Sequence, residues 1–176
     1  MDRQVATAAN AAADALSPER LVEANIHPES LLATDYLNHF NEIIMLMEML
    51  PEMPDCAEDV LAWEPCSYQQ HFEVSGFKDR DLAILAYESA PAAIRADFDT
   101  TIARIDGHLV AAQNMLREAE PGDFESHGRL AALAVDELRP LISRARALVH
   151  GEIAAMPSID DASEENTQSA IDELFE

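Results

Sequence analysis

Basic residues are scarce in this chain of 176 residues, which has 11 lysines and arginines against 34 aspartates and glutamates. The formal net charge of −23 repels phosphate backbones and anionic lipid headgroups, so neither nucleic acid nor a membrane surface is expected as a partner. The same charge steers the protein toward basic protein surfaces. A protein with a basic groove is therefore the kind of partner that the composition favours.

Long apolar runs and cysteines are also few. No segment approaches 18 uninterrupted apolar residues, and the alanine-rich N-terminal stretch lacks the strongly apolar region of a secretory signal. The two cysteines, Cys56 and Cys66, are ten positions apart, which matches neither a disulfide framework nor a zinc motif. These absences predict a cytoplasmic protein with two reduced thiols.

Strand patterns are missing as well, and the apolar residues recur instead at helical spacing. An apolar content of 48% with 6% aromatic residues suits one helical domain with a real core. Two segments, 91–118 and 123–150, each carry a heptad seam with alternating intervals of four and three. The seam residues are Phe98, Ile102, Ile105, Leu109, Ala112 and Leu116 in the first, and Ala131, Ala134, Leu138, Leu141, Ala145 and Leu148 in the second.

The Pro121-Gly122 turn between these segments predicts a long antiparallel helical hairpin, with Asp123 capping the second helix and a kink at Pro140. A third amphipathic helix is expected from near Pro28 to Pro51, with Tyr36, Phe40, Ile43, Met47 and Leu50 on its apolar side. The fold class is thus all-α. The expected organisation is N-terminal helices in residues 1–27, a helical bundle in 28–155 with a cap of short helices at 51–78, and a flexible acidic tail in 156–176.

Six histidines and many carboxylates raise the question of a metal centre. Ferritin-like di-iron bundles place Glu-x-x-His on facing helices, and this sequence contains no such motif. Asp35, His39 and Glu42 share one helical face, but in so acidic a chain such a face is usually only solvated. The methionines between 45 and 53 are typical of core packing rather than of copper binding. We therefore expect no metal and no other cofactor, and the three face residues would be the first ligands to test.

The acidic tail carries the clearest functional signal. Residues 157–176 hold seven acidic and no basic residues, yet they include the apolar Ile171, Leu174 and Phe175. Ser169 can cap a short helix in which these three side chains lie on one side. So short a helix does not form alone in water, and we expect it to fold in the groove of a partner.

The tail segment Thr-Gln-Ser-Ala-Ile-Asp-Glu-Leu-Phe resembles the receiver-binding peptides of flagellar motor switch proteins and, more loosely, of the chemotaxis phosphatase CheZ. Those peptides have the form Ser-Gln-x-x-Ile-Asp-x-Leu-Leu/Phe, and they dock on CheY-type response-regulator receivers. The resemblance is confined to the tail and implies a role in chemotaxis or two-component signalling. It implies that the contact residues are Gln168, Ile171, Asp172, Leu174 and Phe175.

A phosphatase acting on the aspartyl phosphate of the receiver is an alternative. Such an enzyme needs an acid–amide pair that orients water, and the nearest pattern here is Asp35-x-x-Asn38. A histidine phosphotransfer module is another alternative, because His127 opens the second hairpin helix. Its usual His-x-x-Lys-Gly signature would need lysine at Leu130 and glycine at Ala131, however. A generic helical scaffold and a homodimer also stay open, and the sequence favours no enzymatic activity.

Overall fold

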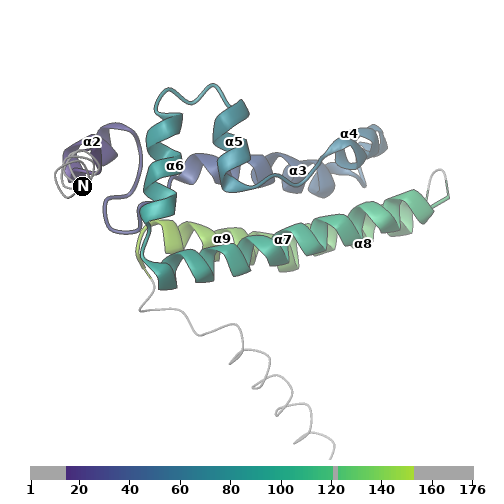
Figure 1. The fold of residues 1–176 in the computed structure, drawn as a ribbon. Coiled ribbons are helices and arrows are strands. Elements are labelled where there is room, and N and C mark those ends of the chain that lie inside the picture. Colours follow the sequence, from purple (N-terminus) through teal and green to yellow (C-terminus); the bar gives the residue numbers. More distant parts are fainter. Residues whose placement is uncertain (1–14, 121–122, 153–176) are drawn as a thin grey trace, which may run out of the picture.

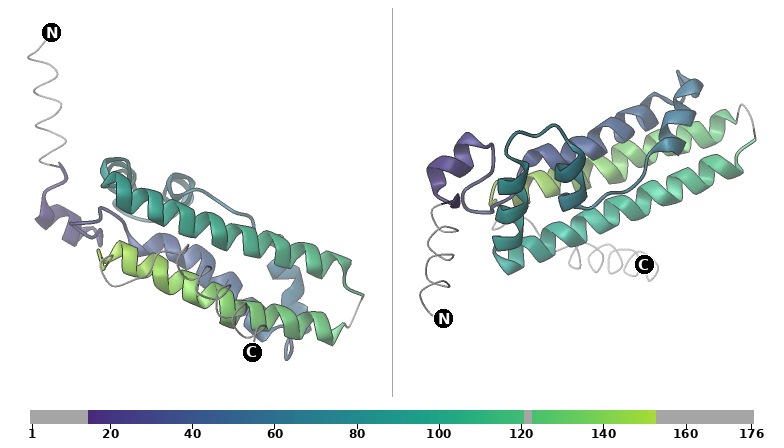
Figure 2. Two further views of the ribbon diagram at one scale, coloured as in Figure 1. Left: turned by 90° about the horizontal axis from the view of Figure 1, so that it is seen from below. Right: turned by 45° about the horizontal axis from the view of Figure 1, so that its top comes forward.

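Three long helical rods form the frame of the protein. The computed structural model describes residues 15–120 and 123–152 (Figure 1). The rods are α3 (Asn38–Met49), α7 (Ala92–Glu118) and a composite of α8 (Phe124–Leu133), the π-helical turn η3 (Ala134–Leu138) and α9 (Arg139–Val149). The composite rod returns antiparallel to α7, and Figure 2 shows α3 lying along the same pair. The all-α bundle built on an antiparallel hairpin is therefore confirmed.

The heptad seams predicted from the sequence meet inside this frame. Ile105 and Leu109 of α7 and Leu138 of η3 are fully buried, and Ile102 and Leu141 are exposed by only 8% and 7%. With 27 residues at about 1.5 Å each, α7 is roughly 40 Å long and supports the whole length of the returning rod. The apolar stripe of α3 is buried against the same rods, so the three form one core.

Short helices complete the described part of the chain. They are α2 (Pro18–Glu23), the 3-10 turns η1 (Thr34–Leu37) and η2 (Pro54–Cys56), α4 (Ala57–Ala62), α5 (Tyr68–Val74) and α6 (Arg80–Ser89). In Figure 1, α4 lies at one end of the frame, whereas α5 and α6 lie toward the other. Helix α2 lies beyond one end of the rods (Figure 1). The segment 51–78 therefore runs along the bundle instead of covering a single end, as the expected cap would have done.

The third predicted helix begins later than its apolar pattern indicated. Its start was expected near Pro28, but α3 begins at Asn38 after the η1 turn. The preceding loop holds Asn25 and Leu31 at φ of 56° and 60°, and the Ser30 hydroxyl donates a hydrogen bond to the Val149 carbonyl. Left-handed residues cannot continue a right-handed helix, so the loop sets the start of α3.

Of the two features expected of the second hairpin helix, the Asp123 cap is confirmed. The Asp123 carboxylate caps α8, because its Oδ1 accepts hydrogen bonds from the Glu125 and Ser126 amides at 3.1 and 3.2 Å. Pro140 is exposed on the solvent side, and the π-helical turn η3 ends two residues before it.

Two predicted segments lie outside the described residues: the first 14 residues of the N-terminal helices expected in 1–27, and the acidic tail. Among the residues that are described, no helix is both long and apolar enough to cross a membrane.

The buried seam yields a stability prediction. Leu109→Ala removes a fully buried side chain between the rods, and it should lower the free energy of unfolding by about 2–5 kcal/mol. Val110→Ala is the matched control, because Val110 is the next residue of α7 and 40% exposed. Denaturant unfolding followed by circular dichroism measures both, and equal losses in the two variants would contradict the assignment of the seam.

Candidate functional site

Three side chains with nitrogen and sulfur donors meet beside the start of α3. One ring nitrogen each of His39 and His71 and the sulfur of Cys66 all lie within 4.8 Å of one another. His39 belongs to α3, Cys66 precedes α5, and His71 lies within α5. We call these three residues the His–Cys cluster. It is half-buried, and its donors are the types that bind zinc in proteins.

The helix start of α5 fixes Cys66 relative to His71. Ser67 and Gln70 form a reciprocal capping box, in which the Ser67 Oγ accepts from the Gln70 amide at 3.2 Å and the Gln70 Oε1 accepts from the Ser67 amide at 2.9 Å. The Tyr36 hydroxyl donates a hydrogen bond of 2.7 Å to the Cys66 carbonyl. The backbone on both sides of the thiol is thus held in place.

A buried amide from the long helix α7 fixes the segment that faces His39. Gln113 is 4% exposed, and its Nε2 donates to the carbonyls of Val60 and Trp63 at 2.9 and 2.7 Å. The Trp63 indole in turn donates to the His39 carbonyl at 3.1 Å, and the two rings pack 5.0 Å apart. The position of His39 therefore depends on both α3 and α7.

His39 has a ring nitrogen that no other residue in the described part of the chain contacts through a hydrogen bond. Its Nε2 is buried and has no hydrogen-bond partner. Burial lowers the pKa of His39, and so does the neighbouring His71, while a hydrogen bond to the backbone of Glu64 acts in the opposite direction. The lowered pKa favours the neutral imidazole, which carries a free lone pair for a ligand bond.

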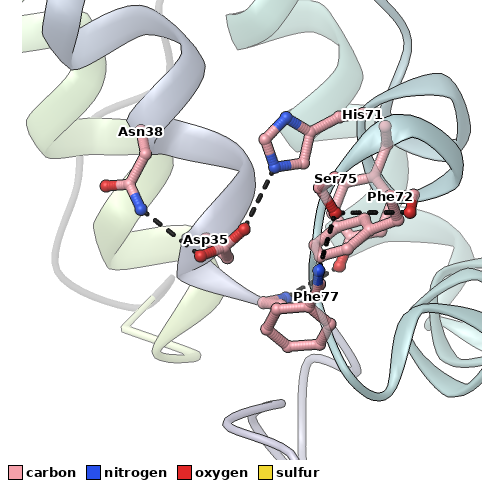
Figure 3. Close-up of polar contacts among 8 residues, drawn as sticks. Asp35, Asn38, His71, Phe72, Ser75 and Phe77 are labelled. Carbon is pink, nitrogen blue, oxygen red and sulfur yellow. Dashed lines mark hydrogen bonds and ion pairs between the residues drawn. The ribbon is translucent and has the colours of Figure 1, made fainter.

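His71 is oriented by a carboxylate (Figure 3). Its Nε2 lies 3.1 Å from the Oδ2 of Asp35, and the Asn38 amide donates to the other carboxylate oxygen at 3.4 Å. Asp35 and Asn38, the acid–amide pair considered from the sequence, are thus brought together. However, the carboxylate already holds His71, whose side chain is only 15% exposed.

Next to the cluster, a recess of about 330 Å³ opens between α5 and α7. Cys66, Tyr36 and Asp106 are among its lining residues. The Oδ1 of Asp106 is buried without a hydrogen-bond partner, and burial raises the pKa of this carboxyl to about 6. Burial also raises the pKa of the Cys66 thiol, with a smaller contribution from Asp106. The recess thus places near the thiol a carboxyl whose Oδ1 has no hydrogen-bond partner in residues 15–120 and 123–152.

The other candidates from the sequence are dispersed. Glu42 is exposed and is not part of the cluster, so the expected face of Asp35, His39 and Glu42 contributes only its first two members to this region. His127 is 6% exposed and therefore poorly placed to receive a phosphoryl group. The residues expected to bind a partner, which lie outside the described part of the chain, are Gln168, Ile171, Asp172, Leu174 and Phe175.

Sequence reasoning missed Cys66 and His71 as members of a site. The signal was a cysteine and a histidine separated by four residues, with a capping box between them. That spacing differs from the usual zinc motifs, and the third member lies 27 positions before Cys66. Only the packing of α5 against the start of α3 brings the three together.

Comparisons with family models, with curated proteins and with solved structures find no match to this chain. Its function therefore has to be argued from its own residues.

Asp106 yields a prediction on pH dependence. Its raised pKa means that the folded protein holds a proton that the unfolded chain releases between about pH 4 and 6, so this group lowers stability as pH rises through that window. Asp106→Asn should remove that loss. Because the side chain is half-buried, we expect the variant to be about 1 kcal/mol more stable than wild type at pH 7.5, with no difference at pH 4.

Thermal unfolding from pH 4 to 8, with a chelator present, measures this difference. Asp97→Asn is the control, because it removes the same charge from an exposed position of α7. A gain of the same size in the control would attribute the effect to net charge instead of to the buried carboxyl.

Proposed function

We propose that this protein is an acidic interaction protein of chemotaxis or two-component signalling that binds a CheY-type receiver through residues 168–175. The observation that carries the proposal is the tail sequence. Ile171, Leu174 and Phe175 can form one apolar side of a short helix, and their surroundings are acidic. In such helix-in-groove contacts the apolar side chains provide most of the affinity, and the acidic residues speed the encounter with a basic partner surface.

The packing of the body supports a role for the tail. The hairpin seams, apart from Ala131, and the stripe of α3 are buried in the core of the bundle. The rods therefore use their own apolar stripes internally, and a helix-in-groove contact requires another amphipathic segment. The tail provides one, and the bundle would then serve as a stable acidic carrier for it. Binding of so short a peptide is expected in the micromolar range, because folding on the partner offsets part of the contact energy.

The test is calorimetric titration of CheY-type receivers, phosphorylated and not, with the full chain. Replacing Leu174 and Phe175 together by alanine should abolish binding and leave the melting temperature of the bundle unchanged. The matched control replaces Val74 and Val135, which are 85% and 54% exposed on the bundle, by alanine. That variant also loses two exposed apolar side chains, but it should bind as wild type does.

The isolated peptide 162–176 gives a second readout. Binding of the peptide with the affinity of the full chain would support a tail that acts alone. Failure of every receiver to bind both peptide and full chain would refute the proposal. Equal loss of binding in the Val74 and Val135 variant would instead place the contact on the bundle.

Phosphatase activity toward the receiver is a second candidate function, and one observation favours it. Asp35 and Asn38 open into a polar recess of about 460 Å³ that is also lined by Asn41, Arg146 and His150. An amide and a cation beside a carboxylate are groups that could hold water and phosphate.

Phosphate release from a phosphorylated receiver tests this second function. If it holds, the full chain accelerates release, and Asn38→Ala abolishes the acceleration while the control Asn41→Ala, in the same recess, retains most of it. Binding without acceleration would leave the interaction role alone.

A further inference from the structure

We propose that the His–Cys cluster is a zinc site, with the Nε2 of His39, the Nδ1 of His71 and the Sγ of Cys66 as its three protein ligands. This inference is independent of the tail. It replaces the expectation of no metal drawn from the sequence, because that expectation rested on motifs and could not see which residues the fold brings together.

The distances fit a small contraction around an ion. In a tetrahedral zinc site, bonds of about 2.0–2.3 Å place neighbouring ligand atoms roughly 3.3–3.8 Å apart. One ring nitrogen of each histidine and the Cys66 sulfur already lie within 4.8 Å of one another. A shift of about 1 Å, which side-chain rotation can supply, completes the geometry without moving the helices.

The unpartnered nitrogen of His39 is the strongest single indication. Most buried polar atoms in folded proteins have a hydrogen-bond partner, because leaving one without a partner costs free energy. The Nε2 of His39 is an exception among the described residues. The backbone of Glu64 acts on the His39 ring as a hydrogen-bond partner, and Nε2 has no partner among the described residues. A backbone acceptor on one ring nitrogen leaves the other as a free lone pair, which is the usual arrangement of a zinc-binding histidine.

His71 has the matching arrangement with a carboxylate. Asp35 engages its Nε2 at 3.1 Å, which leaves Nδ1 for the ion (Figure 3). A carboxylate behind a ligating imidazole fixes the tautomer and increases the basicity of the ligand. Asp35 is thus a positioning residue, and its charge also offsets part of the charge of the ion.

Cys66 supplies the anionic ligand. Without metal, burial and the nearby Asp106 keep it as a thiol. When zinc binds, the S–H bond breaks, the sulfur keeps the electron pair for the metal, and the proton leaves to solvent. The three protein donors leave a fourth position, which water from the adjoining recess would fill.

The first experiment titrates full-length protein, stripped with a chelator, with Zn²⁺ alone. One tight equivalent per chain is expected, along with a higher melting temperature. Titration with Co²⁺ adds a spectroscopic readout, because a thiolate ligand gives an intense charge-transfer absorption that carboxylate and imidazole ligands do not. Zinc should also protect Cys66 from alkylation in the Cys56→Ala background, where it is the only thiol.

Variants then identify the ligands. Cys66→Ser should abolish the cobalt–thiolate absorption, and His39→Ala should remove the tight zinc equivalent. Asp35→Asn should weaken zinc binding by about 10–100-fold, as loss of an outer partner does. Cys56→Ala is the matched control, since Cys56 is also a reduced buried cysteine but lies outside the cluster, and Glu42→Gln controls for loss of an acidic neighbour.

Acidic surfaces bind divalent cations weakly, so the outcomes must separate the two kinds of binding. Tight zinc binding that persists in the Cys66 and His39 variants would overturn the proposal. Absence of both the thiolate absorption and thiol protection in otherwise wild-type protein would also overturn it, and this result does not depend on whether any cluster variant folds.

Discussion

Burial of one apolar seam shared by three rods is the constraint on which the rest of the structure depends. The seam of α7 is covered along its length by the returning rod, and α3 closes the same core. Each buried leucine or isoleucine contributes on the order of 1.5–3 kcal/mol, which is enough to hold a chain whose −23 charge favours expansion. The short helices do not form a separate core, and their positions are set by packing against these rods.

Hydrogen bonds connect the His–Cys cluster to the three rods. At the end of α4 the last carbonyls lack partners within the helix, and Gln113 of α7 donates from inside the core to two of them, those of Val60 and Trp63. A buried amide with both contacts in good geometry specifies one arrangement of the segment, because any shift would leave polar groups unpaired. Trp63 belongs to this segment and donates a hydrogen bond to the His39 carbonyl, so the position of His39 is fixed as well.

Periodicity predicted the parts of the fold that depend on repeated burial. The two hairpin helices, the Asp123 cap and the buried side of α3 all follow from local spacing, and each is present. The start of α3 and the path of 51–78 did not follow from it. Positive φ at Asn25 and Leu31 and the bond from Ser30 to Val149 are set by contacts between distant segments. The His–Cys cluster is of the same kind, since Cys66 and His71 lie in the segment 51–78 and meet His39 only through the packing of that segment.

The contrast between surface and interior also bears on what this protein can select. Its many exposed carboxylates are hard oxygen donors, which attract Mg²⁺ and Ca²⁺ weakly and without specificity. Imidazole and thiolate donors are softer and prefer zinc, and here they are half-buried. Two carboxylates lie close to them without being ligands: Asp35 contacts His71, and Asp106 lies near Cys66. A chain with this charge could therefore concentrate divalent cations at its surface while its interior discriminates among them. Discrimination then depends on the fold, because only the packed arrangement of α3 and α5 brings two imidazoles and a thiol within reach of one ion.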